Sequence, residues 1–89
     1  MHQPPITKAL VAGQIGAYLH HELSVAQLVA WAENTLLAAE FAEPEAAVLR
    51  LVVGRLGVAD VRAFGLTWDD CEQLLGQLGF SARVEVVAA

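Results

Sequence analysis

The sequence predicts a mainly α-helical protein, a small bundle of about four helices with a short helical turn and a C-terminal β-strand. Apolar residues recur at three- and four-residue spacing through most of the chain, which is the period of a helix face. Residues 23–40 show this period most clearly and begin with helix-capping residues. From residue 80 onward the period changes to two, as in a half-buried strand.

The length and apolar content limit the class of protein. A chain of 89 residues has the size of one domain, and we expect a single helical domain at residues 6–89 after a flexible tail at residues 1–5. The hydrophobic fraction of 56% is high and favours a homo-oligomer, such as a dimer, or an obligate partner. The longest run without a charged residue, 9–21, has 13 residues, too few for a membrane span of about 20.

The charge distribution excludes some partners. The net charge is −5, and the few Lys and Arg residues are scattered rather than gathered in a stripe, so we expect no direct nucleic-acid binding. An acidic surface is suited to a basic protein partner, although the charge also keeps an apolar chain soluble. Cys71 is the single cysteine, which excludes an intramolecular disulfide and is consistent with the cytoplasm.

The first helix is expected at residues 6–21, with Pro5 at its first helical position. Gly13 and Gly16 interrupt it, and each costs about 1 kcal/mol relative to Ala in a helix interior. Because neither glycine has a Cβ, we expect another helix to approach closely there. Residues 20–22 then form the turn into the next helix.

The second helix is the best specified. Ser24 and Gln27 have the spacing of a capping box, in which each side chain accepts the backbone N–H of the other residue. Leu23 and Leu28 have the spacing of a hydrophobic staple. The helix shows one broad apolar face, and we therefore expect it to pack in the core.

The third helix is expected at residues 44–56, with Pro44 in its first turn. It is apolar over more than half of its circumference, so we expect it to be the most buried helix. Gly57 fits the left-handed position that ends a helix, with Val58 folding back on Val53 in a Schellman motif.

The same ending recurs 22 residues later. Residues 54–58 and 76–80 share the pattern Gly-x-Leu-Gly-apolar. We expect the same helix end in both places, with Phe80 returning onto Leu75.

Residues 59–65 fit either a single helical turn, which we prefer, or a short strand. Thr67 and Asp70 form a second potential capping box at the start of the last helix. A strand is then expected at residues 80–87, where apolar side chains alternate with others. It needs a partner: residues 58–64 in a βαβ unit, its own copy in a dimer, or a sheet in another protein.

Three groups of residues are candidates for protein contact. The first is an acidic patch with an aromatic anchor, because Trp is enriched at interface hot spots: Trp68, Asp69, Asp70 and Glu72. The second is the strand: Arg83, Val84, Glu85 and Val86. The third is a second apolar surface off the main helix face: Trp31, Leu37 and Phe41. Packing in the core is the alternative for both tryptophans.

Catalytic, metal and cofactor sites are not expected. Adjacent helical residues point about 100° apart, so His20 and His21 do not face one ion. Asp69 and Asp70 have a structural role at a helix N-terminus. Cys71 lies among acidic residues, which raise the pKa of a thiol. No glycine-rich phosphate loop occurs.

These observations favour a non-catalytic protein that binds another protein. In size and acidity the chain is similar to the small helical immunity and antitoxin proteins that mask basic toxins, which implies a basic protein partner. A self-associating homodimer is the second hypothesis, based on the unpaired strand and the apolar content. A small enzyme or metal-binding protein is the third and has the weakest support.

Overall fold

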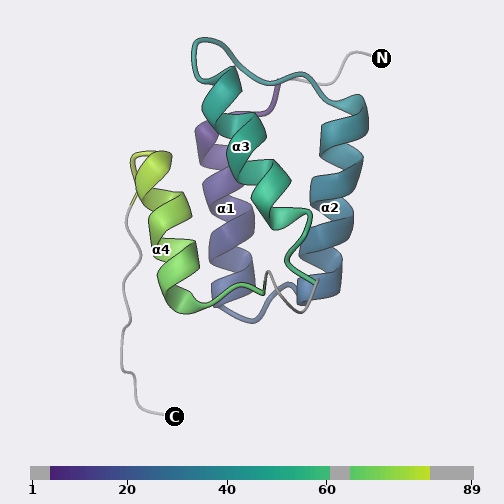
Figure 1. Cartoon of the computed structure of the whole chain (residues 1–89), viewed down its shortest axis with the longest axis vertical. Coiled ribbons are helices and arrows are strands. Elements are labelled where there is room, and N and C mark those ends of the chain that lie inside the picture. Colours follow the sequence, from purple (N-terminus) through teal and green to yellow (C-terminus); the bar gives the residue numbers. More distant parts are fainter. Residues whose placement is uncertain (1–4, 61–64, 81–89) are drawn as a thin grey trace.

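The computed structural model describes residues 5–60 and 65–80, and in these ranges the chain is mainly helical, with no sheet. The four helices are α1 (Lys8–Leu19), α2 (Val25–Ala38), α3 (Ala46–Leu56) and α4 (Trp68–Gln77). Successive helices run in opposite directions (Figure 1). The predicted small helical bundle is therefore confirmed.

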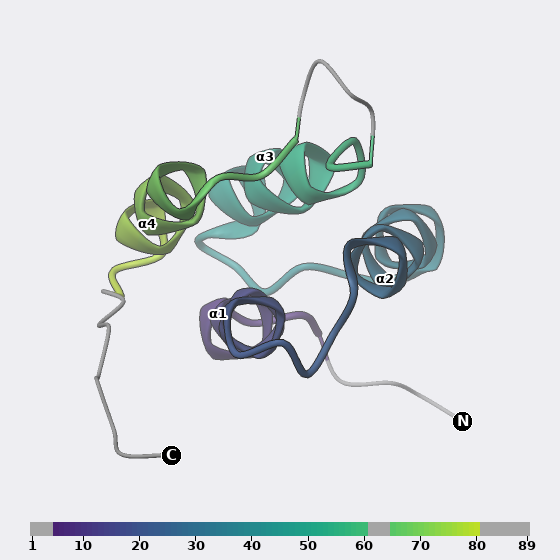
Figure 2. The ribbon, with the colours of Figure 1, turned by 90° about the horizontal axis from the view of Figure 1, so that it is seen from below.

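The helices occupy four corners, as the view along the bundle shows (Figure 2). Helix α3 lies between α2 and α4 on the side that faces the viewer in Figure 1, and α1 lies behind it. All four helices contribute to the core. The largest fully buried side chains are Ile15, Leu28, Leu49, Leu56, Leu78, Val11, Val52, Val53 and Cys71.

Two parts of the prediction lie outside the described residues. The C-terminal strand was expected at residues 80–87, of which only Phe80 is described. The turn or strand expected at residues 59–65 is described only in part: residues 57–60 form turns, and residues 61–64 are outside the described ranges.

Helix α1 begins later than expected. Thr7 is its N-cap, and the Thr7 hydroxyl accepts a hydrogen bond from the Leu10 N–H (3.2 Å). The preceding Ile6 is extended, because its N–H donates to the Glu40 carbonyl (2.7 Å) and its carbonyl accepts from the Ala42 N–H (2.9 Å). Placing the helix start at Ile6, after Pro5, was therefore wrong.

Both predicted capping boxes are confirmed. At the start of α2, the Ser24 hydroxyl accepts from the Gln27 N–H (3.1 Å), and the Gln27 side chain accepts from the Ser24 N–H (2.9 Å). At the start of α4, the Thr67 hydroxyl accepts from the Asp70 N–H (3.1 Å), and the Asp70 carboxylate accepts from the Thr67 N–H (3.0 Å).

The two glycine-rich helix ends differ. Gly79 has a φ of 85°, and the Phe80 N–H donates to the Leu75 carbonyl (2.9 Å), so the Schellman motif after α4 is confirmed. Gly57 has a φ of −66°, which is right-handed, so the same prediction after α3 was wrong. There the chain continues in right-handed turns that bury Ala59.

A Schellman motif also ends α1, where only a turn was expected. His21 has a φ of 62°, its N–H donates to the Tyr18 carbonyl (3.1 Å), and the Glu22 N–H donates to the Ala17 carbonyl (2.8 Å). Histidine is among the residues that adopt this left-handed conformation more often than most.

The glycines of α1 do not mark a close helix contact. A Cβ built on Gly13 or Gly16 would meet no atom within 4 Å. The helix packs through its other side, which carries the buried Val11 and Ile15. The expectation of a close approach at these glycines was wrong.

Helix α3 begins at Ala46, two residues after the expected start. One face is fully buried, through Leu49, Val52, Val53 and Leu56. The opposite side is not covered, since 72% of Leu51 is exposed. The prediction of a highly buried helix thus holds for one face of α3.

Candidate protein-interaction site

A groove of about 510 Å³ lies at the end of the bundle where α1 ends and where α2 and α4 begin, the lower end in Figure 1. Its lining is mainly apolar. The lining residues are Tyr18, Leu19, His21, Leu23, Ser24, Val25, Leu66, Thr67 and Trp68. We refer to this feature as the end groove.

Local sequence signals place each wall of the end groove. The left-handed His21 reverses the chain after α1 and directs Leu23 back to the core, against which it packs. The capping boxes at Ser24 and Thr67 then fix where α2 and α4 begin. Their hydroxyls are occupied by backbone N–H groups, so these two polar side chains form structural parts of the wall.

Trp68 is the first residue of α4 and lines the end groove. It is 36% exposed, and its indole N–H donates to the Glu72 carboxylate (2.6 Å). This hydrogen bond fixes the orientation of the ring. A partly exposed tryptophan that lines the apolar end groove, with its ring fixed by a hydrogen bond, is a suitable anchor for a protein contact.

The carboxylates near the end groove have different roles. Asp69 and Glu72 are exposed on α4, and Glu22 is exposed between two lining residues of the α1–α2 turn. Asp70 instead serves the fold. Its hydrogen bonds from Thr67, and more weakly the nearby Arg55 guanidinium, hold the pKa of the Asp70 carboxyl below its ordinary value.

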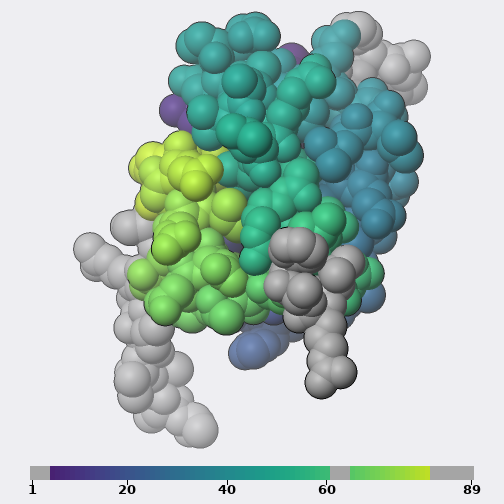
Figure 3. Space-filling view, in the orientation of Figure 1, coloured from purple at the N-terminus to yellow at the C-terminus, as the bar shows by residue number. Residues whose placement is uncertain are grey.

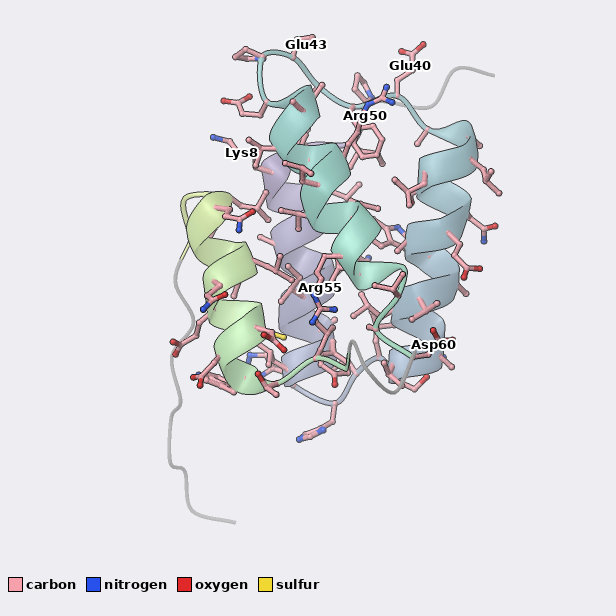
Figure 4. The ribbon with its side chains drawn as sticks, in the orientation of Figure 1. Lys8, Glu40, Glu43, Arg50, Arg55 and Asp60 are labelled. Carbon is pink, nitrogen blue, oxygen red and sulfur yellow. The ribbon has the colours of Figure 1, made fainter. Side chains whose placement is uncertain are left out.

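Arg55 connects α3 to the start of α4. Its guanidinium donates to the Gly65 carbonyl (3.1 Å) and lies 3.5 Å from the Asp70 carboxylate. In Figure 4 the Arg55 side chain extends from α3 toward the segment that leads into α4. Arg55 thus supports the α4 wall of the end groove from the α3 side.

We predict that the stabilisation contributed by the ionised Asp70 carboxylate is lost in acid. Its pKa is lowered in the folded protein, so its stabilisation is present above the ordinary carboxyl pKa and is lost as the pH falls through the folded pKa. Urea unfolding between pH 6 and pH 2 should therefore show that Asp70→Asn lowers stability near neutral pH and that this difference shrinks in acid.

Asp69→Asn is the matched control, because it removes a charge from the same helix turn without breaking the capping box. A stability difference for Asp70→Asn that stays constant down to pH 2 would contradict the prediction.

The other predicted contact residues do not form one surface. Leu37 is 87% exposed on α2, but Trp31 packs against the core cluster. Phe41 is buried next to Ile6, with the Arg50 guanidinium 5.3 Å from its ring centroid. Of the three residues expected in a second apolar surface, Leu37 alone is well exposed. The strand candidates Arg83, Val84, Glu85 and Val86 lie outside the described residues.

The other candidate features of the described ranges are the cysteine, potential metal ligands and potential membrane spans. Cys71 is fully buried, and burial, followed by the Asp70 carboxylate, raises the pKa of its thiol. Among residues 5–60 and 65–80, no three His, Cys, Asp or Glu side chains lie together as potential metal ligands. No helix in these ranges has both the length and the apolar character to cross a bilayer.

The sequence did not indicate the end groove. Its walls come from residues 18–25 and 66–68, which are far apart in the chain. Leu23 and Leu66 could be recognised only as apolar residues next to helix caps. The chain matches no protein-family model, no curated protein and no solved structure with which it was compared.

Proposed function

We propose that this protein is a non-catalytic binding module that holds a basic segment of another protein in the end groove. The observation that carries the proposal is the position of the partly exposed Trp68 in the apolar end groove, near the exposed carboxylates of Asp69 and Glu72, the second of which also accepts the Trp68 indole N–H. An apolar side chain of the partner fits the end groove, and adjacent Lys or Arg residues meet the carboxylates.

The exposed carboxylates near the end groove favour a cationic partner. Glu22, Asp69 and Glu72 are exposed around the end groove, and the whole chain has a net charge of −5. Such a field accelerates the approach of a cationic partner and disfavours an acidic one. The apolar walls also suit the aliphatic stems of Lys and Arg.

Binding is better supported than catalysis. Two potentially reactive groups next to the lining residue Trp68 have structural roles: Asp70 is in a capping box, and the Cys71 thiol is buried with a raised pKa. The proposal resembles the action of immunity and antitoxin proteins, with a basic protein as the partner. A buried lone cysteine suits the reducing cytoplasm as its location.

A peptide selection tests the proposal and requires no identified partner. Random peptides displayed on phage are selected against the immobilised full chain. We expect enriched peptides that combine Lys or Arg with a neighbouring apolar residue, and we expect their affinity to fall as salt is added.

Two variants then locate the binding site. Trp68→Ala, and separately the charge variant Asp69→Asn/Glu72→Gln, should each weaken the selected peptides by about tenfold or more. Glu43→Gln is the matched control, since Glu43 lies at the opposite end of the bundle (Figure 4). Enrichment of acidic peptides, or affinities that neither variant changes, would reject the end groove as the site.

A further inference from the structure

The outward side of α3 (Ala46–Leu56) and the turn that follows it carry a second apolar stripe. Four small or apolar residues follow one another at intervals of four, three and four, and we call them the α3 ridge: Ala47, Leu51, Gly54 and Val58. Leu51 is 72% exposed and Val58 is 37% exposed, and a Cβ on Gly54 would meet no atom within 4 Å. Helix α3 lies across the middle of the face in Figure 3.

The spacing of the α3 ridge is typical of a helix that packs against another helix. Alternating steps of three and four residues form the seam of a coiled coil, whereas the exposed side of a surface helix normally carries charged or polar residues. The inner face of α3 already packs in the core through Leu49, Val52, Val53 and Leu56. The residues of the α3 ridge are therefore not needed for the packing of the bundle.

The charged residues of α3 do not indicate a charged ligand for the α3 ridge. Helix α3 contains no carboxylate. Its two cationic residues flank the ridge, and both have partners within the chain: Arg50 lies over Phe41, and Arg55 binds Gly65 and Asp70. Apart from these two cations, the exposed residues within α3 itself are apolar or small.

We propose that the α3 ridge packs antiparallel against the α3 ridge of a second copy of this chain. A twofold axis midway between residues 52 and 53 places Leu51 of one copy opposite Gly54 of the other. The same axis places Val58 opposite Ala47. Each larger side chain thus faces a small one, and the stripe is complementary to itself without any change in the fold.

Neighbouring features extend this contact. Leu36 of α2 is 42% exposed, and its Cδ1 lies 3.8 Å from the position of a Cβ built on Gly57, next to Val58. The antiparallel arrangement also sets opposite ends of the two helix dipoles side by side. The interface uses α2 and α3, and the end groove of each copy is left for the proposed basic partner.

The dimer and the proposed partner differ in their response to salt. Two copies that each have a net charge of −5 repel one another at long range, so added salt strengthens an apolar contact between them. Binding of a basic segment at the end groove weakens under the same conditions. The dimer can therefore be rejected without rejecting the proposed basic partner, and the reverse also holds.

Sedimentation equilibrium of the full chain at low and high salt is the test. We expect a monomer–dimer equilibrium that shifts toward the dimer as salt is added. Leu51→Asp and Gly54→Leu should each weaken the dimer by about tenfold or more. The first places a charge in the contact, and the second fills the space opposite Leu51.

Gly54→Leu separates the interface from the fold, because Leu is a better helix former than Gly and a Cβ at this position meets no atom within 4 Å in the monomer. Its helicity, measured by circular dichroism, should equal or exceed that of the unmodified chain while its dimer is weaker. Gly76→Leu on α4 and Leu10→Asp on α1 are the matched controls and should leave the dimer unchanged. The exchanged pair Leu51→Ala/Gly54→Leu should restore much of the affinity, since a large residue again faces a small one.

A full chain that stays monomeric at the highest workable concentration would overturn the proposal. So would a dimer that survives both Leu51→Asp and Gly54→Leu. Loss of the dimer in Val84→Asp with retention in Leu51→Asp would assign self-association to the predicted strand and would equally overturn it.

Discussion

Leu56→Ala is expected to lower the free energy of unfolding by about 2–5 kcal/mol, whereas Leu51→Ala is expected to change it by less than about 0.5 kcal/mol. Both residues belong to α3 and undergo the same chemical change. Leu56 is fully buried in the core, so truncation removes apolar contacts and leaves a cavity. Leu51 is 72% exposed, so its truncation removes few apolar contacts from the folded monomer.

Urea unfolding followed by circular dichroism measures both values, at a protein concentration low enough to keep the chain monomeric. A domain of this size has a total stability of about 5–15 kcal/mol, so Leu56→Ala removes a large share of it. Equal losses for the two variants would mean that the outward side of α3 is packed within the monomer, and the α3 ridge would then not be free to bind.

Gly79→Ala is expected to destabilise the chain by about 1 kcal/mol, whereas Gly57→Ala is expected to be neutral or to stabilise it by about 0.4–1 kcal/mol. Gly79 has a φ of 85°, a conformation that strains any residue with a Cβ. Gly57 has a φ of −66°, and a Cβ there lies 3.5 Å and 3.6 Å from two backbone oxygens, at ordinary contact distance.

The same urea experiment measures this pair, and the sign of each change is the informative result. Both glycines sit in the pattern Gly-x-Leu-Gly-apolar, so an account based on sequence alone would give both substitutions the same penalty. A loss of about 1 kcal/mol or more in Gly57→Ala would show that the helix end after α3 is left-handed, as the sequence pattern suggested.

How well each element could be predicted depended on how local its cause is. The capping boxes at Ser24 and Thr67 are complete within four residues, and both were predicted correctly. The ends of α3 and α4 share one local motif, and they differ because the chain leaves the two helices in different directions. After Gly57 the chain turns onward to bury Ala59, whereas Gly79 reverses it at the end of α4. The helix end at His21 carried no glycine to reveal it.

The candidate site shows the same limit. Trp68 and its neighbouring acids could be identified because they are adjacent in the chain, and the role of Asp70 followed from its spacing to Thr67. The end groove could not be predicted, since it forms only when the α1–α2 turn meets the start of α4. The assignment of Phe41 to an exposed apolar surface failed because its partner, Ile6, is 35 residues away and belongs to no helix.

That pairing of Ile6 with Phe41 has a consequence for how the chain opens. The N–H and carbonyl of Ile6 are both bonded to the connector between α2 and α3, so the residue that leads into the N-cap of α1 is held by a segment that is in place only when α2 and α3 are docked. The Lys8–Glu45 ion pair (3.4 Å) spans the same junction. Local opening follows cooperative units of structure, so we expect the first turn of α1 to be released together with the α2–α3 connector, as one unit.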